Sequence, residues 1–260
     1  MVNDQISLTI DGVVAQIVID RAAKRNAFTL DMIHQFDRVL GEIEALEMVR
    51  VVTIEGAGGA SFSSGADLAS FAEQSRESAW QRWVPLGHRV FGRLAALTVP
   101  SIAILNGDAF GGGLELALAC DLRLAAHHVS LGLPEVGIGT LPGWGGTGRL
   151  VTAIGGARAR QMILTGIPVS AIEAESWGLV TECVPADELA RLVETYVVAI
   201  VSRAPIAVGL AKRVLAGLDS TGHRAEVLEG LASALSVTTH DLSEGIAAFR
   251  GKRTSEFKGR

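Results

Sequence analysis

The sequence contains little cysteine and no excess of basic residues. Its 260 residues include two cysteines, Cys120 and Cys183, and both lie in apolar stretches. A disulfide framework is not expected from so few, and buried free thiols in a reducing compartment are typical of this usage. The 23 basic residues against 28 acidic ones give a formal net charge of −5. This balance argues against a general attraction to nucleic acid or to an anionic membrane surface.

Long apolar runs and targeting patterns are also missing. No apolar run approaches the ~20 residues that span a bilayer. The opening segment MVNDQISLTI shows neither a secretory signal nor an Arg-rich transit pattern. The hydrophobic content of 48% and the charged content of 20% are typical of a globular chain. We therefore expect a cytoplasmic protein without nucleic-acid or membrane partners.

Motifs of several common catalytic classes are absent. There is no G-x-S-x-G elbow of a serine hydrolase and no Walker loop for a nucleoside triphosphate. His127 and His128 are adjacent, so on a strand they would point to opposite faces, and no metal site is expected. Residues 143–148, GWGGTG, formally fit the dinucleotide motif G-x-G-x-x-G, but Pro142 disfavours the strand that should precede it. NAD binding therefore stands only as a minor alternative.

The amino-terminal part alternates between strand-like and helix-like segments. Residues 6–20 form two alternating apolar runs joined by Asp11 and Gly12, a pair predicted to supply the positive φ angles of a tight hairpin turn. From Thr29, a predicted N-cap, apolar residues recur at helical spacing as far as Leu46. A β-hairpin followed by an amphipathic helix is therefore expected.

Two later segments repeat one order of strand, glycine-rich loop and helix. The apolar runs at residues 51–56 and 101–105 are each followed by such a loop and by helical spacing. This recurrence predicts parallel strands with crossover helices.

Beyond about residue 185 only helical spacing remains. Pro205 suits the first turn of a helix, and Gly217 and Gly222 are predicted to bracket a break. A helical carboxy-terminal region is expected there.

One carboxylate, Glu115, lies in an unusual setting at residues 109–121, AFGGGLELALACD. Three glycines precede a helix whose first turn exposes backbone N–H groups, which a ligand oxygen can approach closely. A first-turn carboxylate also favours the helix dipole for purely structural reasons. The neighbouring Leu and Ala residues leave no polar face, so we expect Glu115 to be buried with a raised pKa. Such a group can exchange protons near neutral pH.

A second carboxylate, Glu135, precedes another glycine-rich stretch at residues 131–150. Taken alone, Glu135 is equally compatible with a loop residue exposed to solvent. Together with Glu115 it predicts paired carboxylates near aligned backbone donors, an arrangement that suits proton transfer beside a developing enolate.

Six ordered motifs resemble the crotonase superfamily, whose best-known member is enoyl-CoA hydratase. They are DRAAKRNAFTLDM, FSSGADL, NGDAFGGGLELALACD, LPEVGIGTLPGWGGTGRL, TGIPVSAIEAESWGLV and EGIAAFRGKR. The resemblance runs nearly end to end. It implies an α/β fold with a spiral of ββα units over residues 1–200, which carries the acyl-CoA site. It also implies a helical oligomerisation region over residues 201–260 that forms trimers or dimers of trimers.

The resemblance also implies roles for individual residues. The N–H groups of Ala66 and Gly112 would form an oxyanion hole for the thioester carbonyl. Glu115 and Glu135 would hold and activate a water for addition at Cβ, with Glu135 donating a proton to Cα. Gly143 would face that water. Because the thioester itself acidifies the α-proton, no metal or other cofactor is implied, and coenzyme A enters as part of the substrate.

Further positions are carried over by motif. The residues implied to bind CoA or the substrate are Lys24, Ala27, Asp67, Leu68, Phe249 and Lys252, of which the last two would serve a neighbouring subunit's site. Trp144 stands where a small alanine is common, and Gly148 where glutamine is. An indole there would reshape the acyl pocket or else point outward as packing, and the sequence leaves both open.

Alternative functions remain at this point. A Δ3,Δ2-enoyl-CoA isomerase would need only one carboxylate, so the pair favours hydration. A non-catalytic binder of CoA esters is a different class, which the two retained glutamates disfavour.

Overall fold

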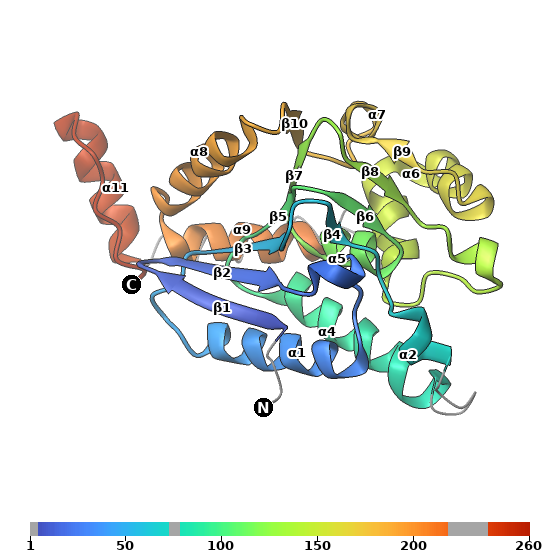
Figure 1. The fold of residues 1–260 in the computed structure, drawn as a ribbon. Helices are drawn as coiled ribbons and strands as arrows, with labels where there is room; N and C mark the ends of the chain where they lie inside the picture. The colour runs from blue at the N-terminus through green and yellow to red at the C-terminus, as the bar shows by residue number, and fades with distance from the viewer. Residues whose placement is uncertain (1–4, 73–78, 218–238) are drawn as a thin grey trace.

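The computed structural model describes residues 5–72, 79–217 and 239–260. Two sheets and the helices packed around them form its body (Figure 1). The larger sheet has the order β1-β2-β3-β5-β7-β10, with β1 antiparallel to β2 and the remaining neighbours parallel. Its strands are Ile6–Asp11, Val14–Ile19, Val51–Gly56, Ser101–Leu105, Leu122–Ala126 and Glu182–Val184.

The smaller sheet has the order β4-β6-β8-β9. Its strands are Ser61–Ser63, Asp108–Phe110, Ser130–Gly132 and Val169–Ser170. Each pass of the chain adds one strand to each sheet, β3 then β4, β5 then β6, and β7 then β8, before a helical segment follows. The expected spiral of ββα units is therefore confirmed. The parallel strands of the larger sheet were predicted. The three-residue strands β4 and β6 were not, because the residues after β3 and β5 were predicted to be loop and helix.

Helices complete the body and extend beyond it. They are α1 (Leu30–Glu44), α2 (Leu68–Ala72), α4 (Val84–Ala96), α5 (Gly112–Ala119), α6 (Gly146–Thr165), α7 (Ala171–Ser176), α8 (Leu189–Val201), α9 (Pro205–Ala216) and α11 (His240–Gly251). Short turns of other helix types lie at η1 (Ala22–Lys24), η2 (Ala79–Trp83) and η3 (Glu135–Ile138).

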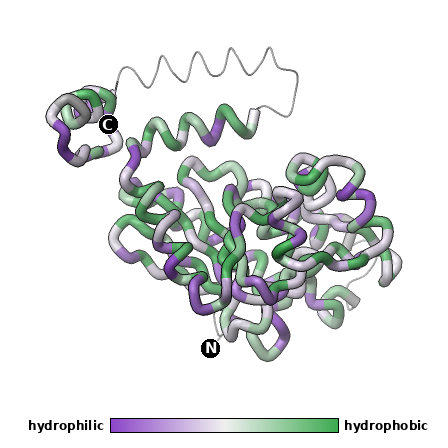
Figure 2. The backbone as a smooth tube through the Cα atoms, turned by 90° about the horizontal axis from the view of Figure 1, so that it is seen from above, coloured by the Kyte–Doolittle hydropathy of each residue, from purple (hydrophilic) through white to green (hydrophobic). Residues whose placement is uncertain are grey.

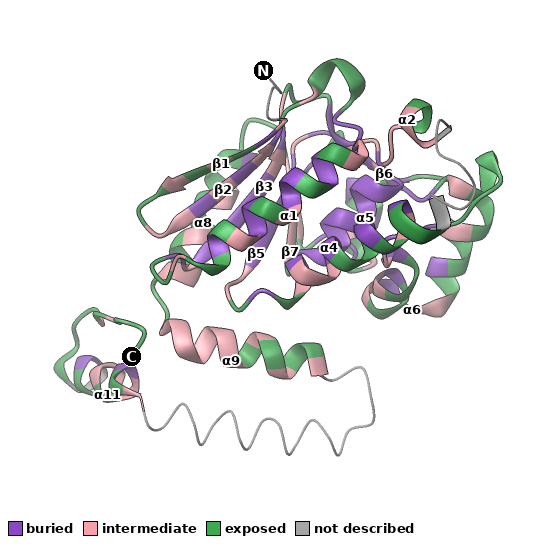
Figure 3. Cartoon of the chain, turned by 90° about the horizontal axis from the view of Figure 1, so that it is seen from below, coloured by how far each residue is buried: buried purple, intermediate pink, exposed green. Residues whose placement is uncertain are grey.

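Helix α5 lies at the centre of the packing. It contacts α4 and α6, and all eight of its residues are buried, as Figure 3 shows. Helix α1 instead buries one face, and its N-cap Thr29 accepts a hydrogen bond from the N–H of Met32, as predicted. A helix buried on all sides shields a polar side chain from bulk water, which sets the environment of Glu115.

The hairpin turn differs by one residue from the prediction. Asp11 pairs with Val14, so the two loop residues are Gly12 and Val13, and of these only Gly12 has a positive φ, +56°. This matches a turn that requires the left-handed region at its first position alone, where glycine fits without strain. Asp11 belongs to the strand.

The expectation for the adjacent histidines was also wrong in detail. His127 and His128 lie in a turn that follows β7, not on a strand. Within the described residues, no group of three or more metal-ligating side chains comes together.

The carboxy-terminal helices extend away from the body, as Figures 2 and 3 show for α9 and α11. Pro205 begins α9 and Gly217 ends it, as predicted, whereas Gly222 lies outside the described residues. Taken singly, no described helix is long and apolar enough to cross a membrane, and α8 and α9 reach that threshold only together, bent by 105°.

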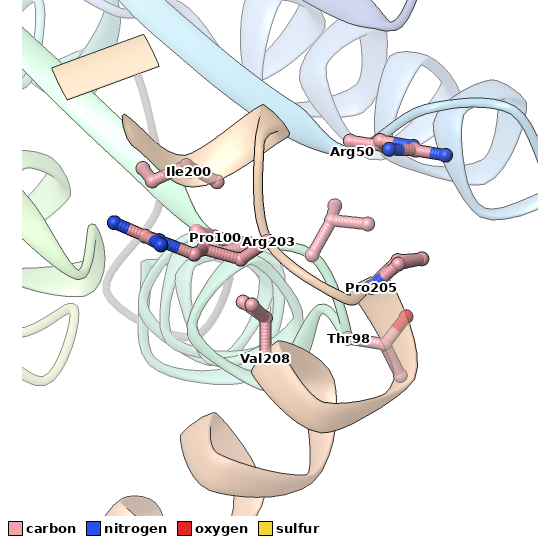
Figure 4. A pocket seen from close by; sticks show the side chains of 8 residues that line it. Arg50, Thr98, Pro100, Ile200, Arg203, Pro205 and Val208 are labelled. Atoms are coloured by element: carbon pink, nitrogen blue, oxygen red, sulfur yellow. The ribbon is translucent and has the colours of Figure 1, made fainter. Parts of the chain in front are cut away.

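Polar contacts tie this helical region to the body. The Arg50 guanidinium donates to the carbonyls of Val201 and Phe257, at the junction seen in Figure 4. The Lys212 ammonium lies 2.6 Å from the Asp121 carboxylate. The cavity of about 20 Å³ beside Arg50 is too small for a substrate.

Candidate active site

Glu115 is buried in the first turn of α5, as predicted, and only 2% of its surface is exposed. Its Oε1 accepts hydrogen bonds from the N–H groups of Trp144 and Gly146, each at 2.8 Å. These donors come from the loop that enters α6, so α5 and the start of α6 hold the carboxylate between them. A residue in the core is thus fixed by the backbone of a second element.

Opposing effects set the pKa of Glu115. Burial raises it because the charged form loses water, while the N–H groups of Gly146, Trp144 and Gly143 and the charge of Arg149 lower it. The net pKa is raised. Arg149 also donates to the Trp144 carbonyl at 3.0 Å, which steadies the loop.

Glu135 begins η3, and its carboxylate faces the amino terminus of α5. A Cβ placed on Gly111, the N-cap of that helix, would lie 3.2 Å from Glu135 Oε1. Oε2 is buried and, within the described residues, has no hydrogen-bond partner. Burial raises the pKa of Glu135 to about 7, and the charge of Glu115 adds to the shift. A pKa near neutrality allows this group to give up and take back a proton around pH 7.

Both carboxylates line one cavity of about 220 Å³. Its other lining residues are mostly apolar and include Leu68, Phe71, Trp83, Val84, Ile138, Leu141 and Trp144. An apolar cavity with a few converging polar groups is the usual form of a small-molecule site.

Two unpaired backbone donors lie at the same cavity. Phe28 and Ala66 form a parallel bridge in which Phe28 bonds to the carbonyl of Gly65 and the N–H of Asp67, so the N–H of Ala66 is directed away from that pairing. Gly112 is the first residue of α5, where an N–H has no partner within the helix. In the described chain, neither N–H donates a hydrogen bond.

These two donors come from loops that approach closely. Gly65 has φ +88°, and a Cβ added to it would lie 2.6 Å from the Gly112 nitrogen. Only glycine allows this approach. The segments that carry the two N–H groups therefore lie against each other beside the cavity.

The loop that carries Ala66 is braced by polar contacts with the segment at residues 21–26. Arg21 forms an ion pair with Asp67 at 2.5 Å. Asn26 is fully buried with φ +56°, and its amide donates to the carbonyls of Ala57 and Ser61. The sequence around Asn26 gave no signal for this role, because these contacts join positions more than 30 apart in the chain.

The residues expected to bind CoA lie in several places. Leu68 is exposed and lines the cavity. Ala27, which precedes Phe28 in the chain, is buried, and Lys24 is exposed on η1. The Asp67 side chain is engaged by Arg21 and by the N–H of Ser70.

Phe249 and Lys252 belong to another part of the molecule. Phe249 lies on α11 and Lys252 follows that helix, on the far side of the molecule from α2 in Figure 1. The chain therefore does not bring these two residues to its own cavity.

The position of Trp144 resolves one alternative left open by the sequence. Its side chain is 3% exposed and lines the cavity, so it does not point outward. Gly148, the other departure from the motif, has open space where a Cβ would stand.

No strand directly precedes residues 143–148, since η3 and irregular chain occupy residues 135–145. This removes the context that a dinucleotide-binding motif requires.

Comparisons with known proteins agree over the whole chain. A family model described as enoyl-CoA hydratase/isomerase matches residues 9–260. The chain is 38% identical to a short-chain-enoyl-CoA hydratase of Clostridium acetobutylicum, covering 99% of both chains. It is 35% identical to a crotonyl-CoA hydratase of Syntrophomonas wolfei, again over 99% of each. A crystal structure of an enoyl-CoA hydratase from Bacillus anthracis superposes with a TM-score of 0.95 at 37% identity, covering 98% of this chain and all of that one.

Proposed function

Because the chain belongs to the enoyl-CoA hydratase/isomerase family, we propose that it adds water across the 2,3 double bond of an enoyl-CoA thioester. The observation that carries this proposal is the convergence of two carboxylates and two unpaired N–H groups on one cavity. Each of these groups has a place in hydration.

The thioester carbonyl oxygen accepts hydrogen bonds from the N–H groups of Ala66 and Gly112. Both donors are fixed in place before the substrate arrives, so little reorganisation is needed as negative charge develops on that oxygen. The polarised carbonyl makes Cβ electrophilic and stabilises the enolate that follows. This scheme requires no metal or redox cofactor.

The two carboxylates divide the proton transfers. Glu115, whose Oε1 already accepts two backbone hydrogen bonds, is the ionised partner and takes a proton from the attacking water. Glu135, whose Oε2 has no partner in the described chain, carries the proton that passes to Cα. The water oxygen bonds to Cβ, the π electrons move to the enolate, and the pair still holds one proton at the end, now on Glu115. We assign Gly143 to positioning the water.

The nucleotide and pantetheine of CoA would lie along the surface formed by Lys24, Ala27 and residues 66–68. Lys24 is exposed and forms no ion pair among the described residues, so its charge is free for a phosphate.

Assembly into trimers, alone or stacked in pairs, would account for α9, which is largely apolar yet contains no buried residue. Phe249 and Lys252 would then serve a neighbouring subunit.

The direct test is turnover of crotonyl-CoA, followed as loss of the enoyl thioester absorbance. We expect hydration to exceed isomerisation of a matched 3-enoyl-CoA by the same preparation. Tight binding of both esters with turnover of only the 3-enoyl ester would contradict the proposal and favour isomerisation.

The pH dependence of hydration follows from the protonated state of Glu135. Its pKa is about 7 because of burial, so the proton needed at Cα is present below that pH and is lost above it. We expect kcat/KM for crotonyl-CoA to fall about tenfold per pH unit above about pH 7. A profile that rises through this range would assign the proton donor elsewhere.

A further inference from the structure

The indole of Trp144 forms the inner wall of the cavity. Its ring lies edge-on to the core residues Phe91, at a centroid distance of 5.3 Å, and Phe28, at 6.4 Å. The outer wall is different, because Leu68, Ile138 and Leu141 are exposed to solvent. A thioester entering from the open side therefore meets Trp144 last.

Two glycines leave the space that this indole occupies. A Cβ on Gly112 would lie 2.3 Å from Trp144 Cζ3, and a Cβ on Gly87, within α4, would lie 2.3 Å from Trp144 Nε1. Glycine inside a helix is destabilising relative to alanine. The presence of Gly87 at that position is explained by the indole that lies against it.

The benzene part of the indole thus rests on the residue that supplies an oxyanion donor. The backbone N–H of the same tryptophan holds Glu115, which takes the proton from the water. The wall is consequently close to both the carbonyl site and the water site.

We propose that Trp144 sets the acyl specificity of this enzyme by closing the inner end of the cavity, so that it accepts short 2-enoyl groups and excludes long ones. The inference rests on the proposed hydration. It is specific to the side chain, because any substitution other than proline keeps the N–H that holds Glu115.

The test compares hydration of crotonyl-CoA, hexenoyl-CoA and decenoyl-CoA by the wild type and by Trp144→Ala. We expect kcat/KM of the wild type to fall along this series. In the variant, the ratio for decenoyl-CoA over crotonyl-CoA should rise about tenfold or more, as expected when several methylenes gain space in an apolar pocket. An unchanged ratio would overturn the proposal. If Trp144→Ala does not fold, Trp144→Phe removes part of the wall and should shift the ratio in the same direction.

Phe91→Leu provides the matched control. Phe91 is buried behind the indole and does not line the cavity, so this variant loosens the core without opening the wall. Its chain-length ratio should remain that of the wild type, and a shift equal to that of Trp144→Ala would overturn the assignment.

Binding separates this proposal from the proposed function. Calorimetry with butyryl-CoA and decanoyl-CoA reports exclusion of the longer chain without any turnover. Absence of hydration would refute the function alone, whereas equal affinity of the wild type for both esters would refute the role of Trp144.

Discussion

Replacing Glu135 with Gln is expected to lower kcat for hydration of crotonyl-CoA by on the order of a thousandfold, the range for loss of a positioned general acid. The amide keeps nearly the shape of the carboxyl group but cannot give a proton to Cα. Because Glu135 is not needed to bind the thioester carbonyl, the affinity for a saturated acyl-CoA should change little. Stopped-flow kinetics together with calorimetry measure the two quantities separately.

Stability provides a control for this variant. The pKa of Glu135 in the folded protein, about 7, lies above the ordinary value of 4.5. The folded state therefore holds the proton more tightly than the unfolded state, and the free energy of unfolding falls as pH rises between these values. Glutamine does not ionise, so at pH 8 the Tm of the variant should equal or exceed that of the wild type. An inactive variant with a lowered Tm at that pH would show a folding defect, and near wild-type kcat would refute the assigned role.

Replacing Gly146 with Ala should reduce kcat about a hundredfold or more through displacement of Glu115. An added Cβ would lie 2.5 Å from Glu115 Cγ and 2.9 Å from its Oε1. The carboxylate cannot keep its hydrogen bonds to the N–H groups of Trp144 and Gly146 at that separation, and a shift of about 1 Å at a reacting group costs on the order of a hundredfold in rate. Steady-state kinetics on crotonyl-CoA measure the loss.

Gly148→Ala is the matched control for that variant. Gly148 lies two positions further along α6, and nothing approaches within 4 Å of the place where its Cβ would stand. Alanine there should leave kcat unchanged and raise Tm slightly, since alanine favours a helix interior over glycine. Equal losses in the two variants would show that the start of α6 is merely sensitive to substitution.

The sequence predicted the fold well where the signals were local. The helix that begins after Thr29, the strands at residues 51–56 and 101–105, and Pro205 at the start of α9 were all found from spacing and caps. The family resemblance read from six motifs is confirmed over the full length. Strands of three residues were missed because so few residues carry no readable alternation.

Contacts within the site were harder to predict from the sequence. The apolar residues around Glu115 predicted its burial. They did not predict which groups would donate hydrogen bonds to its carboxylate, because the two donors lie about 30 residues away in the chain. The role of Asn26 as a brace depends on carbonyls at Ala57 and Ser61, and nothing in its immediate sequence indicates them. Such pairs become neighbours only when the spiral closes.

The sequence by itself determined which residues are available for chemistry: two glutamates beside glycine-rich loops, with a tryptophan where a smaller residue is common. Propensity, capping and apolar spacing act over a few residues, so these features can be read along the chain. The tertiary structure alone decided that Trp144 points inward, that Glu135 Oε2 is left without a partner in the described chain, and that Gly65 approaches Gly112 closely. Each of these depends on the packing of segments distant in sequence, where the shape of one element fixes the space left for another.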